Sequence, residues 1–160
     1  MKSHPTKSGP VPESSQQLPT PSVGASMQVS FALYSAANRV IRLHRPLLEP
    51  LGLTYPQYLV MVTLYASAPR AVGEVGTALD MDTGTLTPLL KRLEAAGLVT
   101  RTRDRADERR VLIDLTDEGR SLRREIESVP SKVNTRCDLT EADQAALRDT
   151  LNGLARPAPG

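Results

Sequence analysis

Apolar residues recur at three- and four-residue steps through most of the chain, a spacing that predicts amphipathic helices. The first such run covers residues 29–45, and Pro46 and Pro50 are expected to bracket its end. The capping-box pattern Thr54–Gln57 predicts the start of a second helix, which Pro69 should close. The chain is therefore expected to begin with two helices separated by a short turn.

The middle of the chain has the pattern of a helix-turn-helix. A short apolar run over residues 72–79 predicts one helix, and the capping residues 80–84 that follow predict a turn. Leucines at helical spacing from Leu86 to Leu93 predict the second helix. Gly97 is its expected stop, because glycine readily adopts the left-handed conformation that ends many helices.

The hydrophobic period changes after this helix. Residues 98–102 and 111–115 have the pattern of strands, and the loop between them, residues 103–110, is almost entirely charged. A helix-turn-helix followed by such a hairpin is a winged helix-turn-helix, here over residues 55–115. We predict a mainly α fold with a small β-hairpin wing.

Two more helices are expected beyond the hairpin. Thr116 should cap the first, Pro130 should bend it, and Thr140 should start the last. Leucine and valine faces in segments 28–50 and 117–155 exceed what one small lobe can cover. We therefore predict that these terminal helices form a dimerisation region.

The two ends of the chain differ in composition from the rest. Residues 1–26 are rich in Pro and Ser and predict a disordered tail, unless translation begins at Met27. Residues 156–160 are expected to be a frayed tail. Residues 27–155 between them form the predicted folded domain.

Composition adds few constraints. Only 3% of residues are aromatic, so the core is expected to consist of Leu, Val and Ala, which suits helices. Cys137 is the single cysteine, which rules out a disulfide within the chain. No apolar stretch is long enough to span a bilayer, and the first residues do not resemble a signal peptide. The expected location is the cytoplasm.

Charge is unevenly distributed, although the net charge is only +2. Between Lys91 and Arg110 seven basic residues face four acidic ones, so positive charge gathers on the predicted second helix and wing. The alternative is a merely solvated charged turn, but the preceding helix pair favours DNA binding. Arg109 is suited to enter a minor groove, and Asp107 to hold a neighbouring arginine. The predicted DNA-binding residues are Thr83, Thr85, Thr87, Lys91, Arg92, Arg101, Arg103, Arg105, Asp107, Arg109 and Arg110.

Two sets of motifs relate the chain to known proteins. The first set is Asp82–Glu94, Asp107–Ile113 and Leu115–Gly119, and the second is Phe31–Tyr34, Pro46–Leu48, Leu53–Leu59 and Gly84–Pro88. By the first set the chain resembles the MarR family of bacterial regulators, over about residues 28–155. The resemblance implies a helical dimer with interlocked first and last helices, and often repression of neighbouring genes. By the second set the chain is most similar, within that family, to the organic-hydroperoxide-sensing OhrR branch.

The OhrR resemblance also implies a sensor pocket. In that branch a reactive cysteine lies near the start of the first helix, and Ser30 stands at its position here. Tyr34 and Tyr55 match two surrounding tyrosines, whereas His44 replaces the third. A serine has no thiolate and cannot be oxidised in the same way. Ser30 is either an engineered replacement or a natural divergence, and the accompanying His44 favours divergence.

Helix geometry limits what this set can do. Ser30 and His44 share a helix face but lie roughly 21 Å apart along the axis, so they can meet only across a dimer. The simpler interpretation, which we favour, is a dimer-interface stripe. Some OhrR-like proteins have a second cysteine near the position of Cys137, which here has no partner and is interpreted as inert. The stripe would contain Ser30, Tyr34, Ala37, Ile41 and His44.

Other classes of function have less support. The sequence has no Ser/His/Asp arrangement, metal-ligand cluster or glycine-rich phosphate loop, so an enzyme is not expected, and neither a cofactor nor a metal is predicted. An adaptor without DNA binding conflicts with the basic wing. The expected partners are a pseudo-palindromic double-stranded operator and a second copy of the chain. The alternative to peroxide sensing is a small aromatic or phenolic ligand between the dimerisation helices and the DNA-binding lobe.

Overall fold

A computed structural model describes residues 25–137 and 139–155. The predicted tails lie outside these residues, except that positions 25 and 26 belong to the first helix. The mainly α fold with a small hairpin wing is confirmed. The elements, in chain order, are α1 (Ala25–Leu48), the 3-10 helix η1 (Glu49–Leu51), α2 (Tyr55–Ala66), β1 (Arg70–Ala71), α3 (Val72–Leu79), α4 (Thr83–Ala95), β2 (Val99–Arg103), β3 (Val111–Leu115), α5 (Asp117–Ser121), α6 (Arg123–Cys137) and α7 (Glu141–Ala155).

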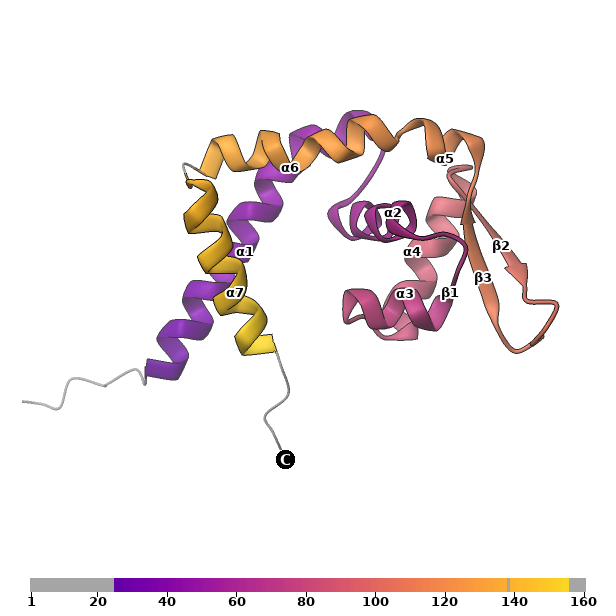
Figure 1. Ribbon diagram of the computed structural model, residues 1–160, viewed down its shortest axis with the longest axis horizontal. Coiled ribbons are helices and arrows are strands. Elements are labelled where there is room, and N and C mark those ends of the chain that lie inside the picture. The colour runs from indigo at the N-terminus through magenta and orange to yellow at the C-terminus, as the bar shows by residue number, and fades with distance from the viewer. Residues whose placement is uncertain (1–24, 138, 156–160) are drawn as a thin grey trace, which may run out of the picture.

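The chain forms a lobe and an arm (Figure 1). The lobe contains α2, α3, α4 and the small sheet. The arm contains α1, α6 and α7, and α5 joins it to the end of β3. Helix α1 packs against α6 and then leads through η1 into α2, so the chain connects arm and lobe at two places.

The sheet has three antiparallel strands in the order β1-β3-β2. In the hairpin Val99 pairs with Leu115 and Arg103 with Val111, so the two five-residue strands match along their full length. The sequence did not predict β1, because two residues are too few to show an alternating pattern. This short strand places the start of α3 beside β3.

The core centres on α4 and the rest of the lobe, and the same apolar cluster extends to residues of α1 and α6. Leu86, Leu90 and Leu93 are fully buried, which confirms the predicted apolar face of α4. They belong to one apolar cluster with Met61 and Ile113 from α2 and β3. This packing fixes α4, so its opposite face is presented outward in a defined orientation.

Several helix ends follow the predicted signals. The backbone N–H of Thr54 donates to Oε1 of Gln57 over 2.9 Å, which completes the capping box of α2. Oγ1 of Thr116 accepts from the N–H of Gly119 and so caps α5. Gly97 has a φ of +73° just after α4, as expected of a glycine stop.

One predicted boundary is confirmed and one was wrong. Helix α1 contains Pro46 and ends at Leu48, between the two prolines that were expected to bracket its end. The helix that starts at Thr116 is divided at Leu122 into α5 and α6, whereas α6 itself continues through Pro130. Helices α1 and α6 pack against each other.

Candidate DNA-binding surface

The N-terminus of α4 is capped by its own acidic residue. Oδ1 of Asp82 accepts from the backbone N–H of Thr85 over 2.8 Å, and Oδ2 accepts from the Thr85 hydroxyl over 3.0 Å. The backbone hydrogen bond from Thr85, followed by the hydroxyl bond, lowers the pKa of Asp82. Asp82 is therefore ionised at the positive end of the helix, and the Thr85 hydroxyl already has an acceptor.

The exposed face of α4 is basic. Thr85, Pro88, Lys91 and Arg92 are exposed, and they lie opposite the buried leucines. Spacings of three and four residues place Thr85, Pro88 and Arg92 along one side of the helix. This face has the length and polarity of an element that lies in a nucleic-acid groove.

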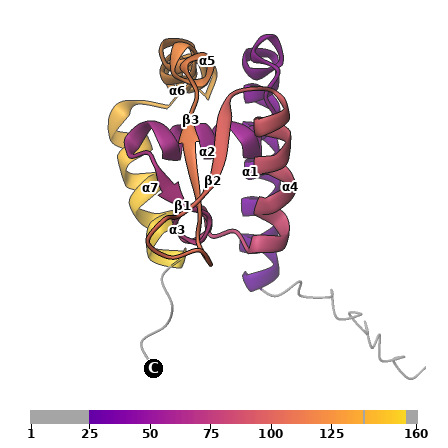
Figure 2. The same cartoon turned by 90° about the vertical axis from the view of Figure 1, so that its right-hand side faces the viewer.

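A groove separates α4 from the wing. It has a volume of about 580 Å³ and includes residues from α3, α4, β2 and the wing. Figure 2 shows the molecule from the side of the wing, with α4 beside it. The structure thus brings together predicted residues that are far apart in sequence, namely Thr83, Thr87, Arg101, Arg109 and Arg110.

Asp107 orients Arg109 within the wing. Oδ1 of Asp107 accepts from the backbone N–H of Arg109 over 3.1 Å and from its Nε over 3.3 Å. The Arg109 side chain is nevertheless 93% exposed. The side chain is therefore held at its base while it extends into solvent, the geometry predicted for this pair.

Two arginines connect the wing to the helix pair. Nη1 of Arg101 lies 3.5 Å from Oε2 of Glu94 in α4. Nη2 of Arg110 donates to Oε1 of Glu74 in α3 over 2.8 Å. Sequence reasoning missed Glu74, because nothing in the local pattern relates it to a residue 36 positions later. Among the described residues, Arg103 and Arg105 form no ion pair, so their charges remain unneutralised at the wing.

The four predicted sensor residues separate into two groups. The His44 ring lies 4.7 Å from the Tyr55 ring and 5.6 Å from that of Tyr58, between centroids. His44 is only 7% exposed, and its Nδ1–H donates to the carbonyl of Val40 over 2.8 Å. Burial raises the pKa of both tyrosines. Sequence reasoning missed Tyr58, although it stands in the same Tyr-Pro-Gln-Tyr motif as Tyr55.

Ser30 and Tyr34 lie elsewhere, in the N-terminal half of α1, and both are exposed in the single chain. His44 is covered within its own chain by α2. The favoured interpretation of a dimer-interface stripe is therefore wrong at its last member, because aromatic packing within the chain buries that residue. Exposure of Tyr34 and Ile41 leaves the rest of the stripe available on α1.

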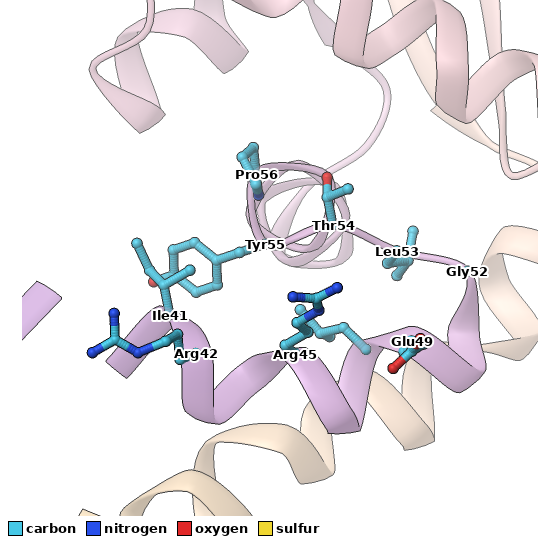
Figure 3. Close-up of a pocket in the computed structure, with 10 residues that line it drawn as sticks. Ile41, Arg42, Arg45, Glu49, Gly52, Leu53, Thr54, Tyr55 and Pro56 are labelled. Carbon is cyan, nitrogen blue, oxygen red and sulfur yellow. The ribbon is translucent and has the colours of Figure 1, made fainter. Parts of the chain in front are cut away.

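A second cavity lies between α1 and α2 (Figure 3). Its volume is about 640 Å³. Ile41, Leu53 and Tyr55 provide apolar walls, whereas Arg42 and Arg45 add positive charge. The cavity lies where the arm meets the lobe, which is the predicted place for a small ligand.

Two other features were not found among the described residues. These residues contain no group of His, Cys, Asp or Glu arranged to hold a metal ion. Within the same residues, no helix has the length and apolar character needed to cross a membrane.

A helix-turn-helix beside an arginine-rich wing defines a winged-helix DNA-binding protein.

Comparisons with known proteins give the family. The family described as transcriptional regulator SarA/Rot matches residues 42–126. The HTH-type transcriptional regulator TtmR of Methylorubrum extorquens is 48% identical, over 79% of this chain but only 65% of that relative's length. The organic hydroperoxide resistance transcriptional regulator of Bacillus subtilis is 42% identical over 79% of this chain and 86% of its own.

A solved structure extends the comparison. A mutant MarR from E. coli complexed with operator DNA superposes with a TM-score of 0.75 at 25% identity, covering 82% of this chain and 96% of that one. The chain belongs to the MarR family of winged helix-turn-helix transcriptional regulators. These relatives are regulators and not enzymes, and the protein is accordingly a DNA-binding transcription regulator.

Proposed function

We propose that the protein is a cytoplasmic repressor that binds a pseudo-palindromic operator as a homodimer. The groove between α4 and the wing carries this proposal, because it gathers Thr83, Thr87, Arg101 and Arg109 on one surface. Helix α4 would enter a major groove and Arg109 the adjacent minor groove. Repression follows where the bound dimer covers a promoter.

Exposed apolar residues on the arm support the homodimer. Phe31 and Tyr34 of α1 are each 69% exposed. Helix α7 has no buried residue in the single chain, although Leu147, Leu151 and Leu154 form an apolar face. Solvent contact with this much apolar surface is unfavourable, and a second copy of the arm would cover it.

We expect the protein to sediment as a dimer at micromolar concentration. Replacing Leu147 and Leu151 together with Glu should give monomers, because two charges would be buried in the proposed interface. Asn152→Glu adds a charge to the same helix at a position outside the apolar face and should leave the dimer intact. A folded monomer of the unmodified chain in sedimentation velocity would contradict the proposed interface.

Arg109→Ala is expected to weaken operator binding by roughly 1–3 kcal/mol, the cost typical of losing a specific groove contact. Lys91→Ala should weaken binding to all sequences alike and flatten its salt dependence, as loss of a phosphate contact does. Anisotropy titrations on a duplex selected from a random pool would measure both effects. Arg124→Ala is the control, because Arg124 is an exposed arginine of α6, away from this surface. Unchanged affinity of Arg109→Ala would remove the wing from the mechanism.

The cavity between α1 and α2 supports a second candidate function, the response to a small aromatic acid. Its apolar walls suit a ring, and Arg42 and Arg45 suit a carboxylate. A ligand in this place would contact both arm and lobe and so change the spacing of the two DNA-binding lobes. Release of the bound duplex by an aromatic carboxylate would test this candidate.

A further inference from the structure

Arg110 closes the turn of the wing. Its carbonyl accepts from the N–H of Asp104 over 3.0 Å, and its own N–H donates to the carbonyl of Asp107 over 2.8 Å. Its Nε lies 4.0 Å from Oδ2 of Asp104. Backbone and side chain of Arg110 are therefore both committed to the shape of the wing tip, residues 104–110.

Glu74 joins this tip to the helix pair. Oε2 accepts from the backbone N–H of Ala71 at the start of α3 over 3.0 Å, while Oε1 accepts from Nη2 of Arg110 over 2.8 Å. One carboxylate thus holds the beginning of α3 and the end of the wing loop together. The side chains of Arg110 and Glu74 are about half exposed, so screening by solvent weakens their ion pair but does not abolish it.

The two attachments of the wing differ in what they hold. The pair Arg101–Glu94 links strand β2 to α4 at a position where β2 is still paired with β3. The pair Arg110–Glu74 acts beyond the last strand pairing, Arg103 with Val111. Without the Arg110–Glu74 pair, the hydrogen bonds and ion pairs that the wing tip forms with other described residues would all lie within the wing itself. The direction of Arg109, next to Arg110, then depends on the Glu74 contact.

A carboxylate beside a DNA-binding groove has an electrostatic cost. Glu74 lines the same groove as Arg101 and Arg109, and its charge repels a phosphate backbone. Removing such a charge would ordinarily raise DNA affinity. We propose instead that Glu74 is a positioning residue that clamps the wing through Arg110, and that Arg110 acts through wing geometry and not by contacting phosphate. This inference rests on the proposed DNA-binding function.

Glu74→Gln tests the clamp with little change in shape. A glutamine retains the oxygen that accepts from Ala71, as Gln57 does for Thr54 in this same protein. We expect about two- to fivefold weaker binding to a selected duplex, the range that an exposed ion pair supports. Glu108→Gln is the matched control, because it removes the same charge from the exposed wing tip. That control should bind equally well or more tightly.

Arg110→Met distinguishes positioning from contact. Loss of a phosphate contact lowers the slope of log affinity against log salt by about 1, whereas loss of a positioning residue leaves the slope unchanged. We expect an unchanged slope, a loss similar to that of Glu74→Gln, and no further loss in the double variant. Tighter binding by Glu74→Gln, or a reduced slope for Arg110→Met, would overturn the clamp.

Hydrogen exchange tests the clamp without DNA. Glu74→Gln should increase amide exchange in residues 104–110, whereas Glu108→Gln should not. Unaltered exchange in Glu74→Gln would refute the clamp. Failure of the unmodified chain to bind any duplex would instead refute the proposed function, and the exchange result would remain interpretable.

Discussion

Gly119→Ala is expected to destabilise the protein by about 3 kcal/mol, at the upper end of the range for overpacking. A methyl group on Gly119 would collide with the carbonyl group of Leu98. That carbonyl cannot simply move aside, because it accepts a hydrogen bond from the N–H of Thr116 over 3.1 Å. The obstacle is backbone, so relief requires α5 to move away from the start of β2.

Gly119 also lies at the joint between lobe and arm. Oγ1 of Thr116 accepts from its N–H and donates to the carbonyl of Gly97. The Tyr65 hydroxyl donates to the carbonyl of Gly119, and burial is the main reason that the pKa of Tyr65 is raised to about 12. Displacement of α5 would strain these bonds together, which adds to the cost of the methyl group.

Urea unfolding of the two glycine variants would measure this effect. Gly73→Ala is the control, because a methyl group on Gly73 of α3 meets no atom within 4 Å. Alanine also favours a helix over glycine, so the control should be as stable as the unmodified chain or slightly more stable. Equal stability of Gly119→Ala and the unmodified chain would show that the joint is looser than its geometry implies.

Local signals predicted much of the fold. Thr54 with Gln57, Thr116 and Gly97 each mark a helix end through bonds or dihedral angles confined to a few residues. The four leucines of α4 revealed its buried face for the same reason, since helical periodicity is a local property. The winged helix-turn-helix then followed from the order of the elements.

Features that depend on tertiary contacts were not predictable. Strand β1 exists because residues 70 and 71 meet β3, not because of their own pattern. In the same way, only the folded chain shows that Glu74 reaches Arg110.

The site residues also divide into features that local sequence patterns predict and features that only tertiary contacts reveal. Asp107 was predicted to hold a nearby arginine, and the two-residue spacing to Arg109 allows this locally. Residues 80–84 were predicted to form a turn of capping residues, but the sequence did not show that Asp82 is the residue that caps α4 or that it binds the Thr85 hydroxyl. Helical spacing assigned His44 to one stripe along α1, whereas the fold turns it toward Tyr55 and Tyr58.

We expect that this protein does not sense peroxide in the way that a regulator with a cysteine at position 30 would. In such sensing a thiolate attacks one peroxide oxygen, the O–O bond breaks, an alcohol leaves and a sulfenic acid remains. Ser30 cannot perform this step, because serine has no thiol to oxidise to a sulfenic acid. Cys137 is the single thiol of the chain, and it is partly buried at the end of α6 that precedes α7 (Figure 1).

We therefore expect the unmodified chain to remain on DNA in the presence of cumene hydroperoxide. A mobility shift on the selected duplex would measure this, with Cys137→Ala as the matched control. Full release that disappears in Cys137→Ala would contradict the expectation and make Cys137 the sensor.

Ser30→Cys extends the same assay to the origin of the serine. If Ser30 replaced a cysteine in an otherwise intact sensor, Ser30→Cys should restore full release by peroxide. We expect partial or no restoration, because His44 stands where the sensing branch has a tyrosine and its Nδ1–H is already bonded to Val40. Ser30 also lies roughly 21 Å from His44 along α1, so a restored thiol could reach the His44–Tyr55 pair only across a dimer. Full restoration would therefore argue both that the sensor is otherwise complete and that the second copy supplies part of it.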